Sequence, residues 1–191
     1  MTKGRLEAFS DAVLAIVITI MVLELKVPHE PTWSALCDLA PVFMSYLLSF
    51  VFLAIYWNNH HHLLHAAKKV NGPILWANIH LLFWLSLVPF VTGWMGENHF
   101  AMIPVMAYGI ILIGAALAYN ILVRILIRHH GKESLIAEAI GSDFKGNMSL
   151  ILYAAAIPAA VLHPWISCGL YIAVALWWLV PDKRIENVIK D

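Results

Sequence analysis

The sequence predicts an all-α integral membrane protein in which residues 1–191 form a single six-span transmembrane domain. Composition is the first reason, because the chain is 61% hydrophobic and only 13% charged, whereas a soluble domain carries about 25% charged residues. The second reason is the spacing of apolar stretches. Stretches close to the roughly 20 residues that cross a bilayer as a helix follow one another along the chain, with polar links between them.

These apolar stretches define the predicted spans in chain order. The predicted spans cover residues 6–25, 36–62, 74–94, 101–126, 147–162 and 165–180. The second is longer than one bilayer requires, so we expect it to tilt or to project beyond the membrane. Pro89 predicts a kink in the third span. The polar links at 66–73, 93–99 and 128–145 are predicted to be loops because of their glycine, proline and charged residues.

Basic residues are distributed unevenly between the two sides that six spans create. Eleven of the twelve lysines and arginines fall on the side shared by both termini, and only Lys26 falls on the other. Positively charged loops remain on the cytoplasmic side of a membrane. The sequence therefore predicts that both termini are cytoplasmic, and an odd number of spans would remove the asymmetry.

Net charge and cysteine content indicate which partners to expect. The formal net charge is zero, whereas a protein that binds nucleic acid shows a clustered basic face. Cys37 and Cys168 lie far apart in apolar surroundings, which favours packing over a disulfide or a metal site. We therefore expect the lipid bilayer as the surrounding medium and no nucleic acid as a partner.

The first span carries a regular edge of mostly uncharged side chains. Alternating steps of four and three residues select Arg5, Phe9, Ala12, Ile16, Thr19, Leu23 and Lys26. This spacing is typical of a helix that packs against copies of itself or lines a shared axis. A ring of aliphatic side chains such as Ile16 closes a pore by excluding water. We expect several copies of this helix to surround an ion path, and the alternative is a packing stripe in an ordinary bundle.

Two polar residues near the start of this span require partners. A carboxylate such as that of Asp11 is unfavourable in lipid unless it meets protein or water. Asp11 lies about 140° from Ile16 around an ideal helix. We therefore expect Ser10 and Asp11 to face away from the pore edge and to hydrogen-bond other helices. The alternative, in which Asp11 faces the ion path, would suit a proton-coupled carrier.

Histidines gather at the end of the second span, in residues 57–65. His61 and His65 are one helical turn apart and share a face that suits a metal. A metal or haem site needs further ligands from other helices, and His80 is the nearest candidate. We favour interfacial or helix-packing histidines and expect no metal and no cofactor. A pH-sensitive element and a histidine-cluster membrane metalloprotein remain alternatives.

Specific residues in the first three spans resemble one family of channels. The pattern Arg5-x-x-x-Phe9-Ser10-Asp11 is the signature of a potassium-channel family whose eukaryotic members work in endosomes and lysosomes, and the chain resembles its prokaryotic branch. Ala12, Ile16 and Thr19 stand where the family places its pore-lining layers. Further similarities are Trp57-x-x-His60, Asn78 and Leu87-x-Pro89-Phe90.

The resemblance implies a non-enzymatic potassium channel in the prokaryotic cell membrane. It implies a homotetramer, because this chain carries one six-span repeat where eukaryotic members carry two. It also implies that the first helices line the pore, with the constriction at Ile16 and potassium discrimination at Thr19, while the signature packs against neighbouring helices. The sequence holds no Thr-Val-Gly-Tyr-Gly filter, so selection by a carbonyl cage is not expected. His61 and His62 depart from the family pattern.

Overall fold

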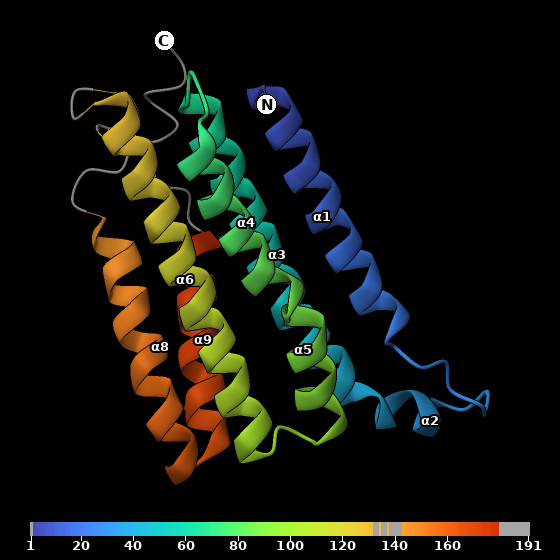
Figure 1. The fold of residues 1–191 in the computed structure, drawn as a ribbon. Coiled ribbons are helices and arrows are strands. Elements are labelled where there is room, and N and C mark those ends of the chain that lie inside the picture. The colour runs from blue at the N-terminus through green and yellow to red at the C-terminus, as the bar shows by residue number, and fades with distance from the viewer. Residues whose placement is uncertain (1, 132–133, 135–136, 138–142, 180–191) are drawn as a thin grey trace.

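The computed structural model describes residues 2–131, 134, 137 and 143–179, which form a bundle of long, roughly aligned helices (Figure 1). The helices are α1 (Lys3–Leu23), α2 (Trp33–Asp38), α3 (Ala40–Ala66), α4 (Gly72–Ser86), α5 (Val88–Glu97), α6 (Met102–His130), α8 (Phe144–Leu162) and α9 (Pro164–Leu179). No strand occurs within the described ranges. The predicted all-α fold class is therefore confirmed.

Five helical stretches are long and apolar enough to cross a membrane. They are α1, α3, the combined stretch Gly72–Glu97, α6 and α8. The sixth predicted span corresponds to α9, which has 16 residues up to Leu179. The structure thus supports five spans by length and composition, and the six-span topology with its shared cytoplasmic side remains a prediction.

The predicted start of the second span is wrong. The prediction placed it at residue 36, but α2 ends at Asp38 and α3 begins at Ala40. Pro41 explains the break, because its ring clashes with the carbonyl four residues earlier, at Cys37, and it offers no amide hydrogen. The short helix α2 was not foreseen. Its N-terminus is capped by the Thr32 hydroxyl, which accepts from the Ala35 amide at 3.2 Å.

The kink predicted near Pro89 corresponds to an interruption between two helices, whereas the loop predicted at 93–99 is wrong over much of its length. Helix α4 ends at Ser86 and α5 begins at Val88, one residue before the proline. Helix α5 then continues through both glycines to Glu97. A Cβ at Gly96 would overlap the α3 backbone at Val42. This glycine allows two helices to approach closely, so it does not mark a turn.

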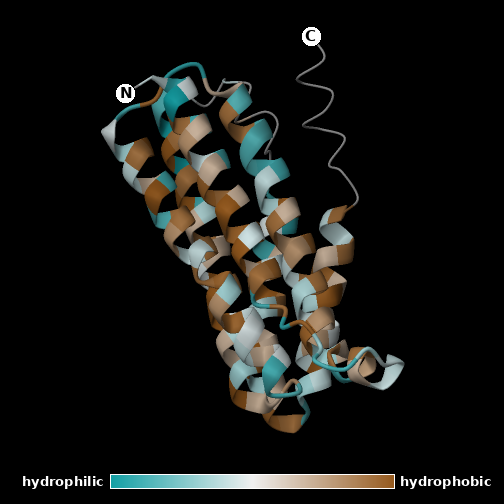
Figure 2. Ribbon diagram, turned by 90° about the vertical axis from the view of Figure 1, so that its right-hand side faces the viewer, coloured by the Kyte–Doolittle hydropathy of each residue, from teal (hydrophilic) through white to brown (hydrophobic). Residues whose placement is uncertain are grey.

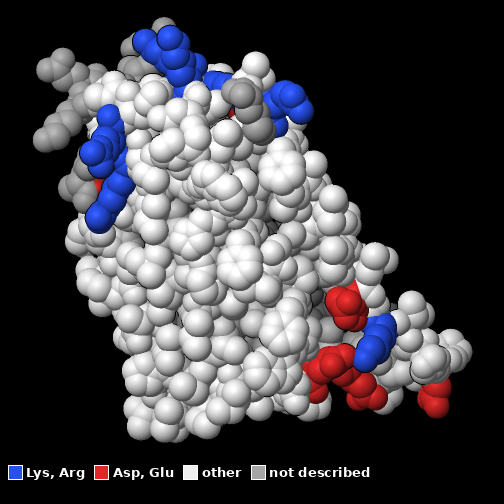
Figure 3. Space-filling model, viewed as in Figure 1, with Lys and Arg blue, Asp and Glu red and all other residues white. Residues whose placement is uncertain are grey.

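Charged residues gather at the two ends of the bundle (Figure 3). One end, where α1 begins, holds Lys3, Arg5, Lys68, Lys69, Arg124, Arg128 and Lys145, and we call it the basic end. The opposite end holds Glu24, Lys26, Asp38 and Glu97, and we call it the acidic end. The helices between the two ends carry mostly hydrophobic residues (Figure 2). Lys132, Lys183, Arg184 and Lys190, which contributed to the predicted asymmetry, lie outside the described residues.

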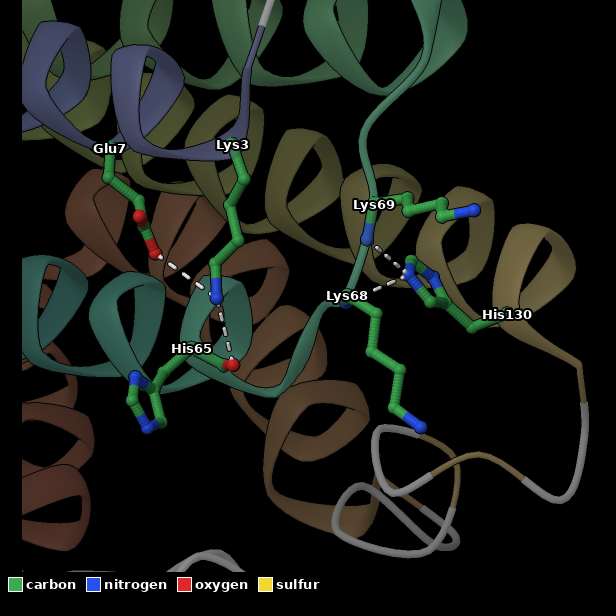
Figure 4. A network of polar contacts seen from close by, with 6 residues as sticks. All are labelled: Lys3, Glu7, His65, Lys68, Lys69 and His130. Carbon is green, nitrogen blue, oxygen red and sulfur yellow. Dashed lines mark hydrogen bonds and ion pairs between the residues drawn. The ribbon is translucent and has the colours of Figure 1, made fainter.

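At the basic end, the start of α1 is tied to the end of α3 (Figure 4). The Lys3 ammonium donates to the backbone carbonyl of His65 at 3.0 Å. It also forms an ion pair with Glu7, one turn further along α1, at 3.6 Å. The carbonyl of His65 belongs to the last turn of α3, where helix carbonyls lack partners within the helix. Lys3 therefore satisfies one of them and joins the first turn of α1 to the last turn of α3.

The link between α3 and α4 is held by a histidine of α6 (Figure 4). His130 Nε2 accepts from the backbone amides of Lys68 and Lys69 at 3.1 Å and 3.2 Å. Its Nδ1 lies 3.0 Å from the Leu126 carbonyl and donates to it, because that oxygen is only an acceptor. The two ring nitrogens thus have fixed and opposite roles, which requires a neutral ring.

Two glycines of α6 bring neighbouring helices close. A Cβ at Gly114 would overlap the Trp84 ring of α4, and one at Gly109 would overlap the Tyr171 hydroxyl of α9. Small residues at helix contacts permit the close packing that holds membrane helices together. Helix α6 therefore packs closely against both α4 and α9. Helix α1 lies at one edge of the bundle (Figure 1) and packs against α3, α4 and α5.

Candidate functional site

Helix α1 has one buried face and one exposed face. Its buried residues are Leu6, Ser10, Leu14, Val17 and Met21. On the other face, Phe9 is 50%, Ile16 57% and Leu23 80% exposed. Arg5, Ala12 and Thr19 are exposed as well. The whole predicted pore edge therefore lies on the side of α1 that the protomer leaves uncovered. In the membrane, this side contacts either lipid or further copies of the chain.

A groove of about 700 Å³ runs beside Ile16, between α1 and the segment where α4 meets α5. From α1 it is lined by Val13, Ile16, Val17 and Ile20, and from the opposite side by Ser86, Pro89, Phe90, Gly93 and Trp94. Glu24 and Glu97 also line it, toward the acidic end. The break near Pro89 thus contributes directly to the surface beside the predicted constriction.

The hydroxyl of Thr19 is oriented by its own helix. Its Oγ1 donates to the Ile16 carbonyl at 2.9 Å, and the side chain is exposed. Because the hydroxyl hydrogen is used within α1, the oxygen presents lone pairs to its surroundings. An oxygen with this arrangement is suited to contact a cation. Thr19 lies one helical turn from Ile16 and one helical turn from Leu23, so it stands between the two aliphatic residues of the predicted pore edge.

A buried chain of hydrogen bonds joins α1 to α3 and α4. His60 Nε2 and Asn78 Oδ1 are 2.6 Å apart, and Asn78 Nδ2 donates to Ser10 Oγ at 2.9 Å. Ser10 in turn donates to the Leu6 carbonyl at 2.9 Å. Since an amide oxygen only accepts, His60 must carry its hydrogen on Nε2 and donate it. We call the three side chains Ser10, Asn78 and His60 the buried triad.

The buried triad lies almost entirely out of contact with solvent or lipid. Ser10 and Asn78 are 0% exposed and His60 is 2% exposed. A buried polar group without a hydrogen-bond partner destabilises a fold, and this arrangement provides partners on three helices at once. The triad therefore fixes both the position of α1 and its rotation about its own axis.

Asp11 contacts a different part of α3. One carboxylate oxygen accepts from the Trp57 indole nitrogen at 2.9 Å, and both side chains are exposed. The Trp57 ring stacks on His61, with centroids 5.8 Å apart, and His61 stacks on His65 at 6.1 Å. Asp11 thus lies between the triad and the exposed edge of α1. Arg5 and Phe9, the other signature residues, are exposed in the protomer.

A second polar chain, not foreseen from the sequence, joins α5, α3 and α6. The Thr92 hydroxyl donates to the Val88 carbonyl at 2.7 Å and lies 2.6 Å from Ser49 Oγ. Ser49 Oγ in turn lies 3.0 Å from the Tyr108 hydroxyl. All three side chains are buried. The only indication of this chain in the sequence was one hydroxyl-bearing residue inside each of three apolar spans. Nothing in the sequence indicated that these hydroxyls meet, because 43 residues separate Ser49 from Thr92 and 59 separate it from Tyr108.

The histidines of the 57–65 segment have packing partners. His60 belongs to the buried triad, and His61 stacks between Trp57 and His65. His80, the nearest further candidate ligand, accepts from the Trp84 indole nitrogen at 3.0 Å. Within the described part of the chain, no three His, Cys, Asp or Glu side chains come together in a way that could hold a metal ion.

Similar proteins identify the family. The family model described as "Endosomal/lysosomal potassium channel TMEM175" matches residues 5–89. A potassium channel of a Chryseobacterium species is 57% identical over 191 residues, which is 100% of both chains. The chain belongs to the TMEM175 family. TMEM175 proteins are ion channels and not enzymes, and the bacterial relatives place this TMEM175 chain with the prokaryotic members.

A second bacterial relative has both a matching sequence and a solved structure. A potassium channel of Chamaesiphon minutus is 29% identical over 92% of each chain. The crystal structure of a lysosomal potassium-selective channel TMEM175 homolog from the same species superposes with a TM-score of 0.82 and 28% identity. That superposition covers 93% of this chain and 96% of the other. The helical arrangement described above is therefore that of a TMEM175 channel.

Proposed function

We propose that this TMEM175 protein is a leak-type potassium channel of the prokaryotic cell membrane, with α1 of four identical copies around one pore. The observation that carries the proposal is the exposed edge of α1, which is apolar except for Thr19 along its membrane-spanning part. This edge belongs to a chain that matches, over 100% of both chains, a relative named a potassium channel. Both termini are then cytoplasmic, and the basic end faces the cytoplasm.

The chemistry of the exposed face supports contact with further copies. Ala8, Ala12 and Ala15 are all exposed, and small residues allow helices to approach closely within a membrane. Thr19 is exposed on the same helix, and intramembrane polar groups face water-filled cavities or protein far more often than acyl chains. The exposure of Thr19 in the protomer is thus best explained if this edge of α1 borders a shared, hydrated axis.

Side-chain size along the edge supports a constriction at Ile16. Ala12 is smaller and lies one turn toward the basic end, while Thr19 lies one turn toward the acidic end. A ring of isoleucine side chains narrows the path and disfavours water there. The Thr19 oxygens would then contact an ion that has lost part of its hydration shell, beside this constriction. Leu23 forms the next layer, and it is 80% exposed in the protomer.

Charges at the acidic end favour a cation over an anion. Glu24 and Glu97 line the groove that borders α1. Acidic side chains around a cleft with low-dielectric walls raise the local concentration of cations. Ser10, Asp11, Trp57, His60 and Asn78 then have a positioning role, since they fix α1 against α3 and α4 without lying on its apolar edge.

Potassium flux in proteoliposomes tests the proposal. With a potassium gradient as the only drive, we expect flux that does not saturate in the manner of a carrier and needs no proton gradient. Ile16→Asn should increase the flux or relax its selectivity, because an amide lets water persist at the constriction. Thr19→Val should reduce the preference for potassium over sodium.

A matched control separates the pore from a general effect of asparagine in a lipid-facing surface. Ile110 on α6 is 51% exposed, so Ile110→Asn makes the same chemical change on another helix and should leave flux unchanged. If substitutions at Ile16 and at Thr19 both leave flux unchanged, the pore assignment is wrong. Flux that requires a proton gradient would favour a carrier, and stoichiometric iron or zinc in the purified protein would favour a metalloprotein.

A further inference from the structure

Two adjacent histidines at the end of α6, His129 and His130, hold the link between α3 and α4, residues 67–71. His130 Nε2 accepts from the backbone amides of Lys68 and Lys69, while its Nδ1 donates to a carbonyl of its own helix. His129 Nδ1 lies 3.1 Å from the Asn71 side-chain nitrogen and accepts from it, because an amide nitrogen only donates. Both histidines therefore serve the link as hydrogen-bond acceptors.

A protonated imidazole cannot make these contacts. Both ring nitrogens of a histidinium carry hydrogen, so neither accepts a hydrogen bond. The link in contact with α6 thus excludes a proton from His130 Nε2 and His129 Nδ1, whereas a link that has moved away leaves both atoms free to bind one. By linkage, acidification favours the state that binds more protons. Histidine changes its charge between about pH 5 and 8, so this balance falls in the physiological range.

The charged groups around the two rings are positive. Lys68 and Lys69 extend from the link on either side of the His130 ring (Figure 4), and Arg128 precedes the histidines in the last turn of α6. The two rings meet edge to face, with centroids 5.1 Å apart. Among the described residues, neither histidine forms an ion pair with Asp or Glu. A proton on either ring therefore adds a like charge beside the lysines, which pushes the link away from α6.

The link connects this contact to two other helices. Asn71 is the N-cap of α4, where its Oδ1 accepts from the Ile74 amide at 3.1 Å. At the other end of the link, Lys3 of α1 donates to the His65 carbonyl in the last turn of α3. We propose that His129 and His130 form a pH-sensitive switch, which holds the link against α6 when both rings are neutral and releases it when they are protonated.

Hydrogen exchange of the backbone amides in residues 67–71, measured by mass spectrometry on the full-length protein in detergent, tests the inference. His130→Gln supplies an acceptor oxygen that does not titrate. At about pH 8, where histidine is neutral, this variant and the wild type should exchange equally slowly. At about pH 5.5, the wild type should lose protection about fivefold relative to His130→Gln, which corresponds to the loss of about one hydrogen bond. Comparison at equal pH cancels the pH dependence of chemical exchange.

Two further variants separate the acceptor from other effects of acid. His130→Phe retains a ring but has no acceptor, so it should exchange rapidly at both pH values. His29→Gln removes an exposed imidazole from the link after α1 and should match the wild type at both. The inference is overturned if acid reduces protection equally in the wild type and in His130→Gln. It is also overturned if His130→Phe retains the wild-type protection at the higher pH.

Discussion

The two faces of α1 carry similar aliphatic side chains in opposite surroundings. Leu14 is 1% exposed, whereas Ile16, two positions further and about 200° around the helix, is 57% exposed. Hydrophobicity alone therefore does not show which face packs within the protomer. The difference lies in the polar residues, because Ser10 on the buried face bonds Asn78 while Thr19 on the exposed face bonds only its own helix in the protomer.

The largest predicted effect comes from the same substitution on the two faces. Leu14→Asn buries a side-chain amide that has no hydrogen-bond partner, and it removes packed apolar atoms. We therefore expect it to lower the free energy of unfolding by about 3–5 kcal/mol. Ile16→Asn should leave the protomer folded and change ion flux instead. Thermal unfolding in detergent and proteoliposome flux measure the two outcomes. Equal loss of folded protein in both variants would show that the protomer does not leave Ile16 uncovered.

The next effect concerns the buried triad. Asn78→Leu has a similar volume, but it leaves the buried Nε2 of His60 without an acceptor and removes one of the two hydrogen bonds of Ser10. We therefore expect a loss of about 2–4 kcal/mol, since an orphaned buried polar group costs about 1–3 kcal/mol and a lost hydrogen bond about 1 kcal/mol. Ser10→Ala removes one end of the chain and should cost about 1 kcal/mol. Chemical unfolding of the purified protein measures both values. Ile79→Leu, at an exposed position of the same helix, is the control and should change little.

A smaller effect is expected where α1 contacts Trp57. Asp11→Ala removes the acceptor of the indole hydrogen bond, so we expect a loss of about 1 kcal/mol and a lower yield of folded tetramer. Asp11→Asn retains an acceptor and should lose less. A double-mutant cycle with Trp57→Phe isolates the contact, and the two losses should not add. A well-folded Asp11→Ala variant with altered permeation would instead assign Asp11 a direct ionic role.

The smallest effect is expected at the acidic end, away from both faces. Lys26 Nζ donates to Glu97 at 2.6 Å, and this contact raises the pKa of the Lys26 ammonium above its ordinary value of 10.5. A raised pKa means that the pair stabilises the fold fully below pH 10.5 and ceases to do so as the pH rises through the folded-state pKa. The pair is exposed, so the contribution is slight. As the pH rises above 10.5, unfolding temperatures should fall more for the wild type than for Glu97→Gln, whereas at pH 9 the pair should still contribute fully.

Several features of this channel were predictable because they depend on local sequence. Hydropathy and length located the long helices to within a few residues, since a helix that crosses a bilayer must be predominantly apolar over about 20 residues. The break near Pro89 followed from the missing amide hydrogen of proline. The four-and-three spacing of Phe9, Ala12, Ile16 and Thr19 selected one edge of α1, because side chains at that spacing share a face of any helix.

Other features depend on contacts between distant residues. Whether the edge through Ile16 or the face through Leu14 packs inside the protomer was decided by Asn78, which meets Ser10 across 68 residues of sequence. Gly96 lies in a segment whose composition is typical of a turn, yet it belongs to helix α5. Its missing side chain is explained by the α3 backbone, which packs directly against it. Helical period and hydropathy are properties of neighbouring residues, so the sequence alone determined which segments are helices and which residues share a face. The partner of each face depends on how the helices pack, and that was decided only by the tertiary structure.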